Sequence, residues 1–183
     1  MHTKFYFYAM DTKTLANLPN YQVHPESKLI VRFQDCDPFQ HLNQSRYLDY
    51  FVNAREDQLR EHYGLDIYKF AMENGSGWMV VRNQIAYLRQ VMVNEIVTIQ
   101  THVIDFDTQN VTVEMIMWDE QKIKPKALLW ATFAFVNMLE GKRATHSEDI
   151  MEFYRRVKWS DVIAQTFDQR VNGLYQIGKE KKT

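Results

Sequence analysis

The chain has 183 residues, of which 45% are hydrophobic and 25% are charged, so it can bury the core of one domain. Its formal net charge of -1 provides no basic field for nucleic acid. The single cysteine excludes an intrachain disulfide and a cysteine-rich metal cluster. No apolar run approaches the roughly 20 residues of a membrane-spanning helix, and the N-terminus lacks a signal-peptide pattern. These features predict a cytoplasmic protein that binds neither nucleic acid nor membranes.

The first third of the chain predicts one strand and one long helix. Residues 1–27 show no clear period and are interpreted as an N-terminal extension. The apolar, β-branched run KLIVRF at 28–33 is typical of a strand. Pro38 then interrupts the pattern, because proline restricts the residue before it. Tyrosine, phenylalanine and alanine side chains at helical spacing predict a helix over 45–65.

The remainder of the chain predicts four strands and a final helix. The strand segments are rich in β-branched and aromatic residues and cover 78–89, 96–106, 110–118 and 127–138. The last of them is nearly all apolar, which favours a strand that is covered on both faces. Short links between segments favour antiparallel pairing. Apolar residues at helical spacing after Ser147 predict the C-terminal helix.

This order of elements predicts an α+β fold in which one curved antiparallel sheet wraps round the long helix. The domain is expected to cover residues 28–140, and a C-terminal helical extension and tail residues 141–183. The helix over 45–65 is apolar nearly all round in its first two turns, so other structure should enclose it.

The most specific pattern in the chain is DCDPFQHLN at 35–43, followed by Tyr47 and Leu48 at the start of the long helix. With this motif between a strand and an aromatic helix, the chain resembles the hotdog-fold acyl-CoA thioesterases of the 4-hydroxybenzoyl-CoA thioesterase type. Two further segments support the resemblance in the right order, IAYLR ahead of NEI at 85–96 and ATFAFV ahead of EGK at 131–142.

The resemblance implies a hotdog fold, hydrolysis of an acyl-CoA thioester, and a homodimer or homotetramer with active sites at subunit interfaces. It also implies that the second acid of the motif, Asp37, is the catalytic carboxylate. Two positions depart from the patterns of relatives. Gln40 stands where many members have glycine, and Phe39 stands where the plant acyl-carrier-protein thioesterases have asparagine.

Thioester hydrolysis needs a base or nucleophile, a site for the oxyanion, and groups that position the substrate. Asp37 can act as a general base on water or attack the thioester directly, or it can simply cap the turn before Pro38. Backbone N–H groups at the start of the long helix lack intrahelical partners and can bind the oxyanion.

Other residues of the motif have a catalytic and a structural interpretation. His41 can bind the thioester carbonyl or orient Asp37, or it can be a structural loop residue. Asn43 can bind water or substrate, or it can cap the helix. Gln40 and Tyr47 are candidate substrate-binding residues, and Tyr47 could equally belong to the core.

Cys36 and Glu56 are weaker candidates for chemistry. Negative charge from the acids on either side of Cys36 disfavours its thiolate, so we interpret it as a packing residue. Glu56 lies on the long helix, and some relatives use a carboxylate placed there. No pattern indicates a metal or a nucleotide cofactor, so neither is expected.

The sequence therefore predicts an acyl-CoA thioesterase, with two alternatives left open. One is hydrolysis of acyl-carrier-protein thioesters, which a basic patch would favour because carrier proteins are acidic. Arg82, Arg89 and Lys142 could contribute to such a patch. The other is a hotdog protein that binds acyl-CoA without hydrolysing it.

Overall fold

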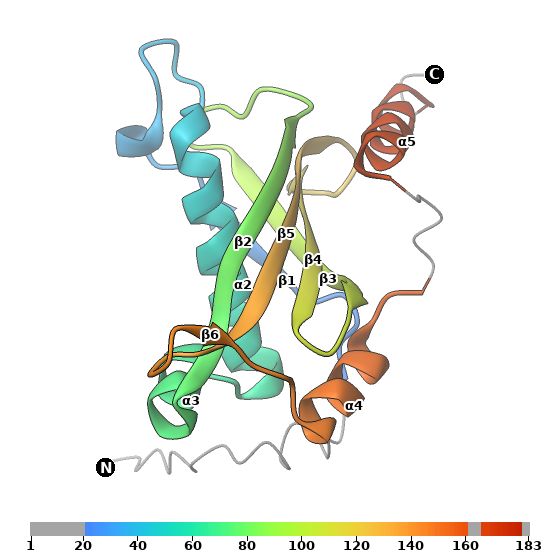
Figure 1. The fold of residues 1–183 in the computed structure, drawn as a ribbon. Coiled ribbons are helices and arrows are strands. Elements are labelled where there is room, and N and C mark those ends of the chain that lie inside the picture. The colour runs from blue at the N-terminus through green and yellow to red at the C-terminus, as the bar shows by residue number, and fades with distance from the viewer. Residues whose placement is uncertain (1–20, 161–165, 181–183) are drawn as a thin grey trace, which may run out of the picture.

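The computed structural model describes residues 21–160 and 166–180 (Figure 1). Most of the expected N-terminal extension, residues 1–20, lies outside the described residues. The helices and strands, in chain order, are β1 (Glu26–Ile30), α2 (Tyr47–Tyr63), α3 (Ile67–Asn74), β2 (Ser76–Tyr87), β3 (Ile96–Phe106), β4 (Asn110–Asp119), β5 (Pro125–Asn137), β6 (Lys142–Arg143), α4 (Glu148–Val157) and α5 (Phe167–Glu180).

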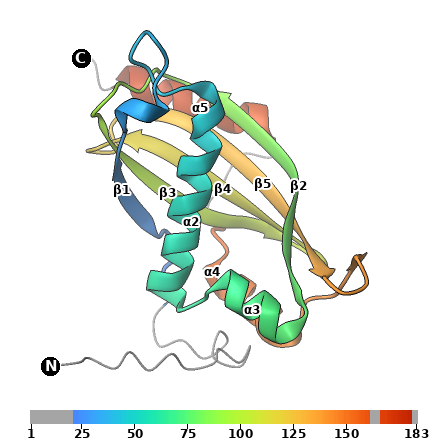
Figure 2. The ribbon, with the colours of Figure 1, turned by 90° about the vertical axis from the view of Figure 1, so that its left-hand side faces the viewer.

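The strands form one curved antiparallel sheet, with α2 lying across its concave face (Figure 2). The strand order is β1-β3-β4-β5-β2, with β6 paired to β5. The predicted α+β arrangement of one sheet wrapped round one long helix is thus confirmed. Consecutive strands pair from β3 to β5, but β2 does not pair with β3. It pairs with β5 from Ser76 to Tyr87 and therefore forms an edge of the sheet.

The core lies between α2 and the sheet. Tyr47, Phe51 and Ala54 of α2 are buried there, as the helical spacing predicts. Leu48 and Val52 are exposed, so the expectation that other structure encloses the first two turns on all sides is wrong for the single chain. The buried face of α2 also includes two polar side chains, Arg55 and Gln58. Gln58 is satisfied because its Nε2 donates to Ile99 O at 3.0 Å and its Oε1 accepts from the Thr101 hydroxyl.

Two helices were not predicted. Asp66 caps α3, because its Oδ1 accepts hydrogen bonds from the N–H groups of Tyr68 and Lys69. The helix is short and buries only Phe70, so its sequence has little periodicity. The predicted C-terminal helix is α4, which Ser147 caps.

The second unpredicted helix, α5, covers the convex face of the sheet opposite α2 (Figure 2). Its Leu174 is fully buried in a cluster with Ile116 of β4 and Leu128 of β5. This contact explains why β5 is apolar on both faces. The strand packs against the α2 side with one set of side chains and against α5 with the other.

His102 of β3 predicts a pH dependence of stability. Its side chain is 2% exposed, and burial, with a smaller contribution from His24, lowers its pKa to about 3. In the unfolded chain a histidine has a pKa of about 6.5, so between pH 6.5 and 3 the unfolded state binds the additional proton. The contribution of His102 to stability is therefore fully present above pH 6.5 and is lost as the pH falls toward 3, by up to about 1.4 kcal/mol per pH unit.

Urea denaturation at several pH values measures this effect. We expect His102→Gln to have a shallower loss of unfolding free energy than the wild type between pH 6.5 and 4. Equal slopes for the two proteins would show that His102 is not the group responsible.

Candidate active site

Asp37 lies in a tight turn that closes residues 37–41. Its backbone N–H donates to His41 O at 2.8 Å, and its carbonyl accepts from Gln40 N at 3.0 Å. Its Oδ1 accepts hydrogen bonds from the N–H groups of Phe39 and His41, at 2.9 and 3.0 Å. Oδ2 has no hydrogen-bond donor among the described residues. Asp37 therefore caps this turn, which is the structural role that the sequence left open. The cap uses only one oxygen of its carboxylate.

Gln40 has a φ of 66°, in the left-handed region that glycine adopts without strain. Its carbonyl accepts from Val93 N at 2.9 Å, which ties the turn to the segment between β2 and β3. The turn thus keeps a conformation suited to glycine although a glutamine occupies the position. The departure from the family pattern at Gln40 costs strain without preventing the turn.

Replacing Gln40 with glycine is expected to raise the free energy of unfolding by about 0.5 to 1 kcal/mol, because it relieves the left-handed strain. The Gln40 side chain is exposed, so little contact is lost. Gln34→Gly is the matched control. Gln34 lies in the 3-10 turn Phe33–Asp35 with an ordinary φ, so glycine should destabilise the protein there. Chemical denaturation of both variants measures the difference, and a loss of stability in Gln40→Gly would contradict the prediction.

Asp35, the first acid of the motif, connects the turn to α2. Its Oδ2 accepts from the Tyr50 hydroxyl at 2.9 Å, and its Oδ1 lies 3.7 Å from Arg46 Nε. The Tyr50 hydroxyl in turn accepts from Arg32 N at 3.1 Å. Asp35 therefore positions the loop against the helix, whereas Asp37 retains one oxygen without such a partner.

Asp37 opens onto a cleft of about 440 Å³ at the N-terminal end of α2. His41 and Tyr47 also line it, so three of the five predicted site residues are brought together. Gln40 and Asn43 are not among the lining residues. The other residues that line the cleft were not among the predicted catalytic or substrate-binding residues, and they are Leu42, Gln44, Tyr87, Leu88, Arg89 and Gln90. Leu42 and Gln44 lie in the same stretch as the motif, whereas residues 87–90 lie at the end of β2 and just after it, and reach this end of α2 through the tertiary structure.

Asn43 caps the 3-10 turn Gln44–Arg46 that leads into α2. Its Oδ1 accepts from both the backbone N–H and the hydroxyl of Ser45, each at 3.0 Å. The capping interpretation of Asn43 thus has direct geometric support. The backbone N–H of Gln44, in contrast, has no acceptor among the described residues, and Gln44 lines the cleft. A backbone N–H group at the start of a helix that lacks an acceptor can donate to an anionic group.

Two side chains in the motif and at the start of α2, Tyr47 and Cys36, have pKa values above their ordinary values. Burial raises the pKa of Tyr47 to about 12, with smaller contributions from Tyr87, Glu95 and Asp37, so its hydroxyl remains a hydrogen-bond donor. Burial also raises the pKa of the Cys36 thiol, and the carboxylates of Asp35 and Asp37 raise it further. A thiolate nucleophile at Cys36 is therefore disfavoured, as the sequence predicts.

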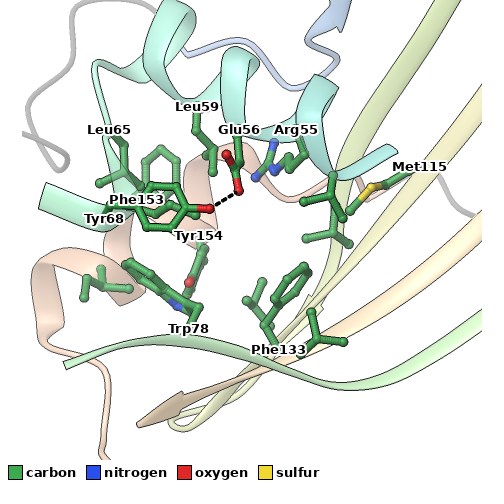
Figure 3. Close-up of a pocket in the computed structure, with 16 residues that line it drawn as sticks. Arg55, Glu56, Leu59, Leu65, Tyr68, Trp78, Met115, Phe133, Phe153 and Tyr154 are labelled. Atoms are coloured by element: carbon green, nitrogen blue, oxygen red, sulfur yellow. Dashed lines mark hydrogen bonds between the residues drawn. The ribbon is translucent and has the colours of Figure 1, made fainter. Parts of the chain in front are cut away.

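A second cavity, of about 260 Å³, lies between α2 and the sheet (Figure 3). Apolar side chains of α2, β2, β4, β5 and α4 form most of its lining, together with the charged residues Arg55 and Glu56. Glu56, the alternative carboxylate on the helix, is thus directed to a different cavity from Asp37. Its Oε1 accepts from the Tyr68 hydroxyl at 2.9 Å.

Among the described residues, no group of three or more histidine, cysteine or acidic side chains could hold a metal ion. None of the helices in the described ranges is long and apolar enough to cross a membrane.

The family model of the thioesterase-like superfamily matches residues 31–167, which include the turn, the cleft and the whole sheet from β2 to β5. The chain belongs to the thioesterase-like superfamily. No curated protein matches it in a sequence search.

Solved structures that are similar to this chain confirm the hotdog fold. The probable thioesterase YbaW of Escherichia coli superposes with a TM-score of 0.63 at 22% identity, over 73% of this chain and 98% of that one. A hypothetical protein of Staphylococcus aureus in complex with CoA gives 0.68 at 12% identity, over 81% and 94%. The DHNA-CoA thioesterase of Staphylococcus aureus gives 0.66 at 15% identity, over 73% and 90%. At these identities the structures establish the fold alone.

Proposed function

We propose that this protein is a cytoplasmic acyl-CoA thioesterase that hydrolyses an acyl-CoA to a free acid and CoA, with Asp37 as the general base or nucleophile. The observation that carries the proposal is the position of Asp37. One carboxylate oxygen is held by two N–H groups of the turn, and the other has no donor among the described residues of the cleft. The carboxylate is therefore fixed in direction and still able to accept a proton or attack a carbonyl.

The other groups of the cleft supply the remaining requirements of thioester hydrolysis. The N–H of Gln44 is the proposed oxyanion donor, and the protonated Tyr47 hydroxyl and the His41 ring are proposed to position the thioester carbonyl. Asn43 acts through the turn that it caps, and Gln40 through the backbone conformation that it adopts. The relative bound to CoA and the relative that is a DHNA-CoA thioesterase support a CoA ester as the substrate.

Hydrolysis of acyl-carrier-protein thioesters has less support. Arg89 lines the cleft near the end of β2 at Tyr87. Lys142 pairs with Asn137, which itself pairs with Ser76 at the opposite end of β2. Arg89 and Lys142 are therefore separated by about the length of a 12-residue strand, on the order of 35 Å, with Arg82 in the middle of that strand.

We propose a homodimer formed through the edge strand β2. Met79 and Val81 of this strand are 51% and 50% exposed, whereas Val80 between them lines the cavity under α2. An exposed apolar edge strand readily pairs with another strand. Because α5 covers the convex face of the sheet, a tetramer that packs these faces together has less support. Light scattering on the purified protein measures the mass.

A panel of short-chain, long-chain and aromatic acyl-CoAs tests the proposed function by release of free thiol. We expect turnover of at least one class. Tight binding of CoA esters without any release of thiol would instead favour the hotdog protein that binds acyl-CoA without hydrolysing it. Absence of both binding and turnover across the panel would contradict the proposed function.

A further inference from the structure

The 260 Å³ cavity under α2 is open to solvent on one side and closed on the other. Tyr68 and Val80, which line its open side, are 59% and 49% exposed. Phe153 and Tyr154 of α4, which line its closed side, are 2% and 5% exposed. A small apolar molecule could therefore enter between α3 and β2 and lie against β4 and β5 (Figure 3).

The two charged residues of this cavity differ in how their charges are compensated. Glu56 accepts from the Tyr68 hydroxyl, and its Oε2 lies 3.8 Å from Arg60 Nη2. Arg55 is only 9% exposed, and its partners are neutral. Its Nη1 donates to Thr101 Oγ1 at 3.1 Å, and the Tyr63 hydroxyl is its other side-chain partner. Among the described residues, no carboxylate oxygen lies within 4.0 Å of the Arg55 guanidinium.

A buried guanidinium without a counter-ion is unfavourable, because arginine stays protonated and hydroxyl partners offset its lost hydration only in part. Burial lowers the pKa of Arg55, and Tyr63 and Tyr154 oppose this effect. An anionic group that entered the cavity would supply the missing charge and accept charge-assisted hydrogen bonds. The apolar walls would bind the rest of such a molecule.

We propose that this cavity binds a small apolar ligand that carries a carboxylate, and that Arg55 binds the carboxylate. The site is separate from the Asp37 cleft and has its own lining residues. Two sources share this chemistry. The carboxylate can belong to a free fatty acid, or it can be the distal carboxylate of a dicarboxylic acyl group on CoA.

Calorimetric titration of the full-length protein with octanoic acid and 1-octanol tests the first source. Thioether analogues of adipoyl-CoA and hexanoyl-CoA, which cannot be hydrolysed, test the second. In at least one pair we expect the ligand with the carboxylate to bind about tenfold more tightly than its uncharged partner, as a charge-assisted hydrogen bond implies. Because these measurements need no turnover, their result is independent of thioesterase activity.

Variants of Arg55 and of the apolar wall identify the site. Arg55→Met should abolish the preference for the carboxylate and leave binding of 1-octanol unchanged, whereas Arg55→Lys should retain a preference. Val113→Phe, which fills the cavity from β4, should weaken both ligands. Equal binding of the charged and uncharged partners by the wild type, no binding of any ligand, or a preference that persists in Arg55→Met would each overturn the proposal.

Discussion

Replacing Asp37 with asparagine is expected to lower kcat/KM for acyl-CoA hydrolysis by about 10²- to 10⁴-fold, the usual contribution of a general base. The fold should be retained, because the asparagine Oδ1 can accept the same hydrogen bonds from Phe39 and His41. The change therefore removes the basicity of the free oxygen while it preserves the turn. Free-thiol release measures activity, and thermal denaturation checks that the melting temperature is close to that of the wild type.

Glu56→Gln is the matched variant, because Glu56 is the other carboxylate that lines a cavity on this side of the sheet. Glutamine can still accept from the Tyr68 hydroxyl, so the local contact persists. We expect this variant to keep most of the activity. If Glu56→Gln were inactive and Asp37→Asn active, the catalytic carboxylate would be on the helix, and the assignment of Asp37 would be wrong.

The fold could be predicted largely because its main elements have strong local patterns. The β-branched and apolar runs of β3 and β4, and the aromatic face of α2, are local patterns whose side chains pack in the core. The position of β2 in the sheet could not be predicted from its place in the sequence next to β3. A strand with mostly exposed side chains and a link to β3 can pair on either side of the sheet. Its pairing with β5 depends on the complete curved sheet.

The site could be predicted only where the motif itself is local. Asp37, His41 and Tyr47 lie within one short stretch of sequence, and they line one cleft. Arg89 and Tyr87 belong to the IAYLR segment, but they reach the same cleft only through the tertiary structure, which the linear sequence does not show. Gln40 illustrates a second limit. A left-handed backbone is expected at a glycine, so a glutamine at this position does not indicate the left-handed conformation that the turn adopts.

The unpredicted helix α5 is anchored by a buried ion pair. Glu114 of β4 has a side chain with 0% exposure, and Arg170 of α5 binds both of its oxygens. The Arg170 Nη2 to Glu114 Oε1 distance is 2.8 Å, and Trp130 Nε1 donates to Glu114 Oε2 at 2.8 Å. The sequence around Glu114, in the predicted strand 110–118, does not indicate that Arg170 is its partner, because Arg170 is 56 residues away in sequence.

Replacing Arg170 with methionine is expected to lower the free energy of unfolding by about 3 to 5 kcal/mol, because it leaves the Glu114 carboxylate buried without a counter-ion. That loss is a large fraction of the roughly 5 to 15 kcal/mol that stabilises a typical domain. Urea denaturation measures it. The double variant Glu114→Gln with Arg170→Met should recover most of the loss, since the neutral amide can still accept from the Trp130 indole. A loss below about 1 kcal/mol in Arg170→Met would mean that Glu114 gains water when α5 shifts. The apolar contacts of Leu174 would then be what holds α5 on the sheet.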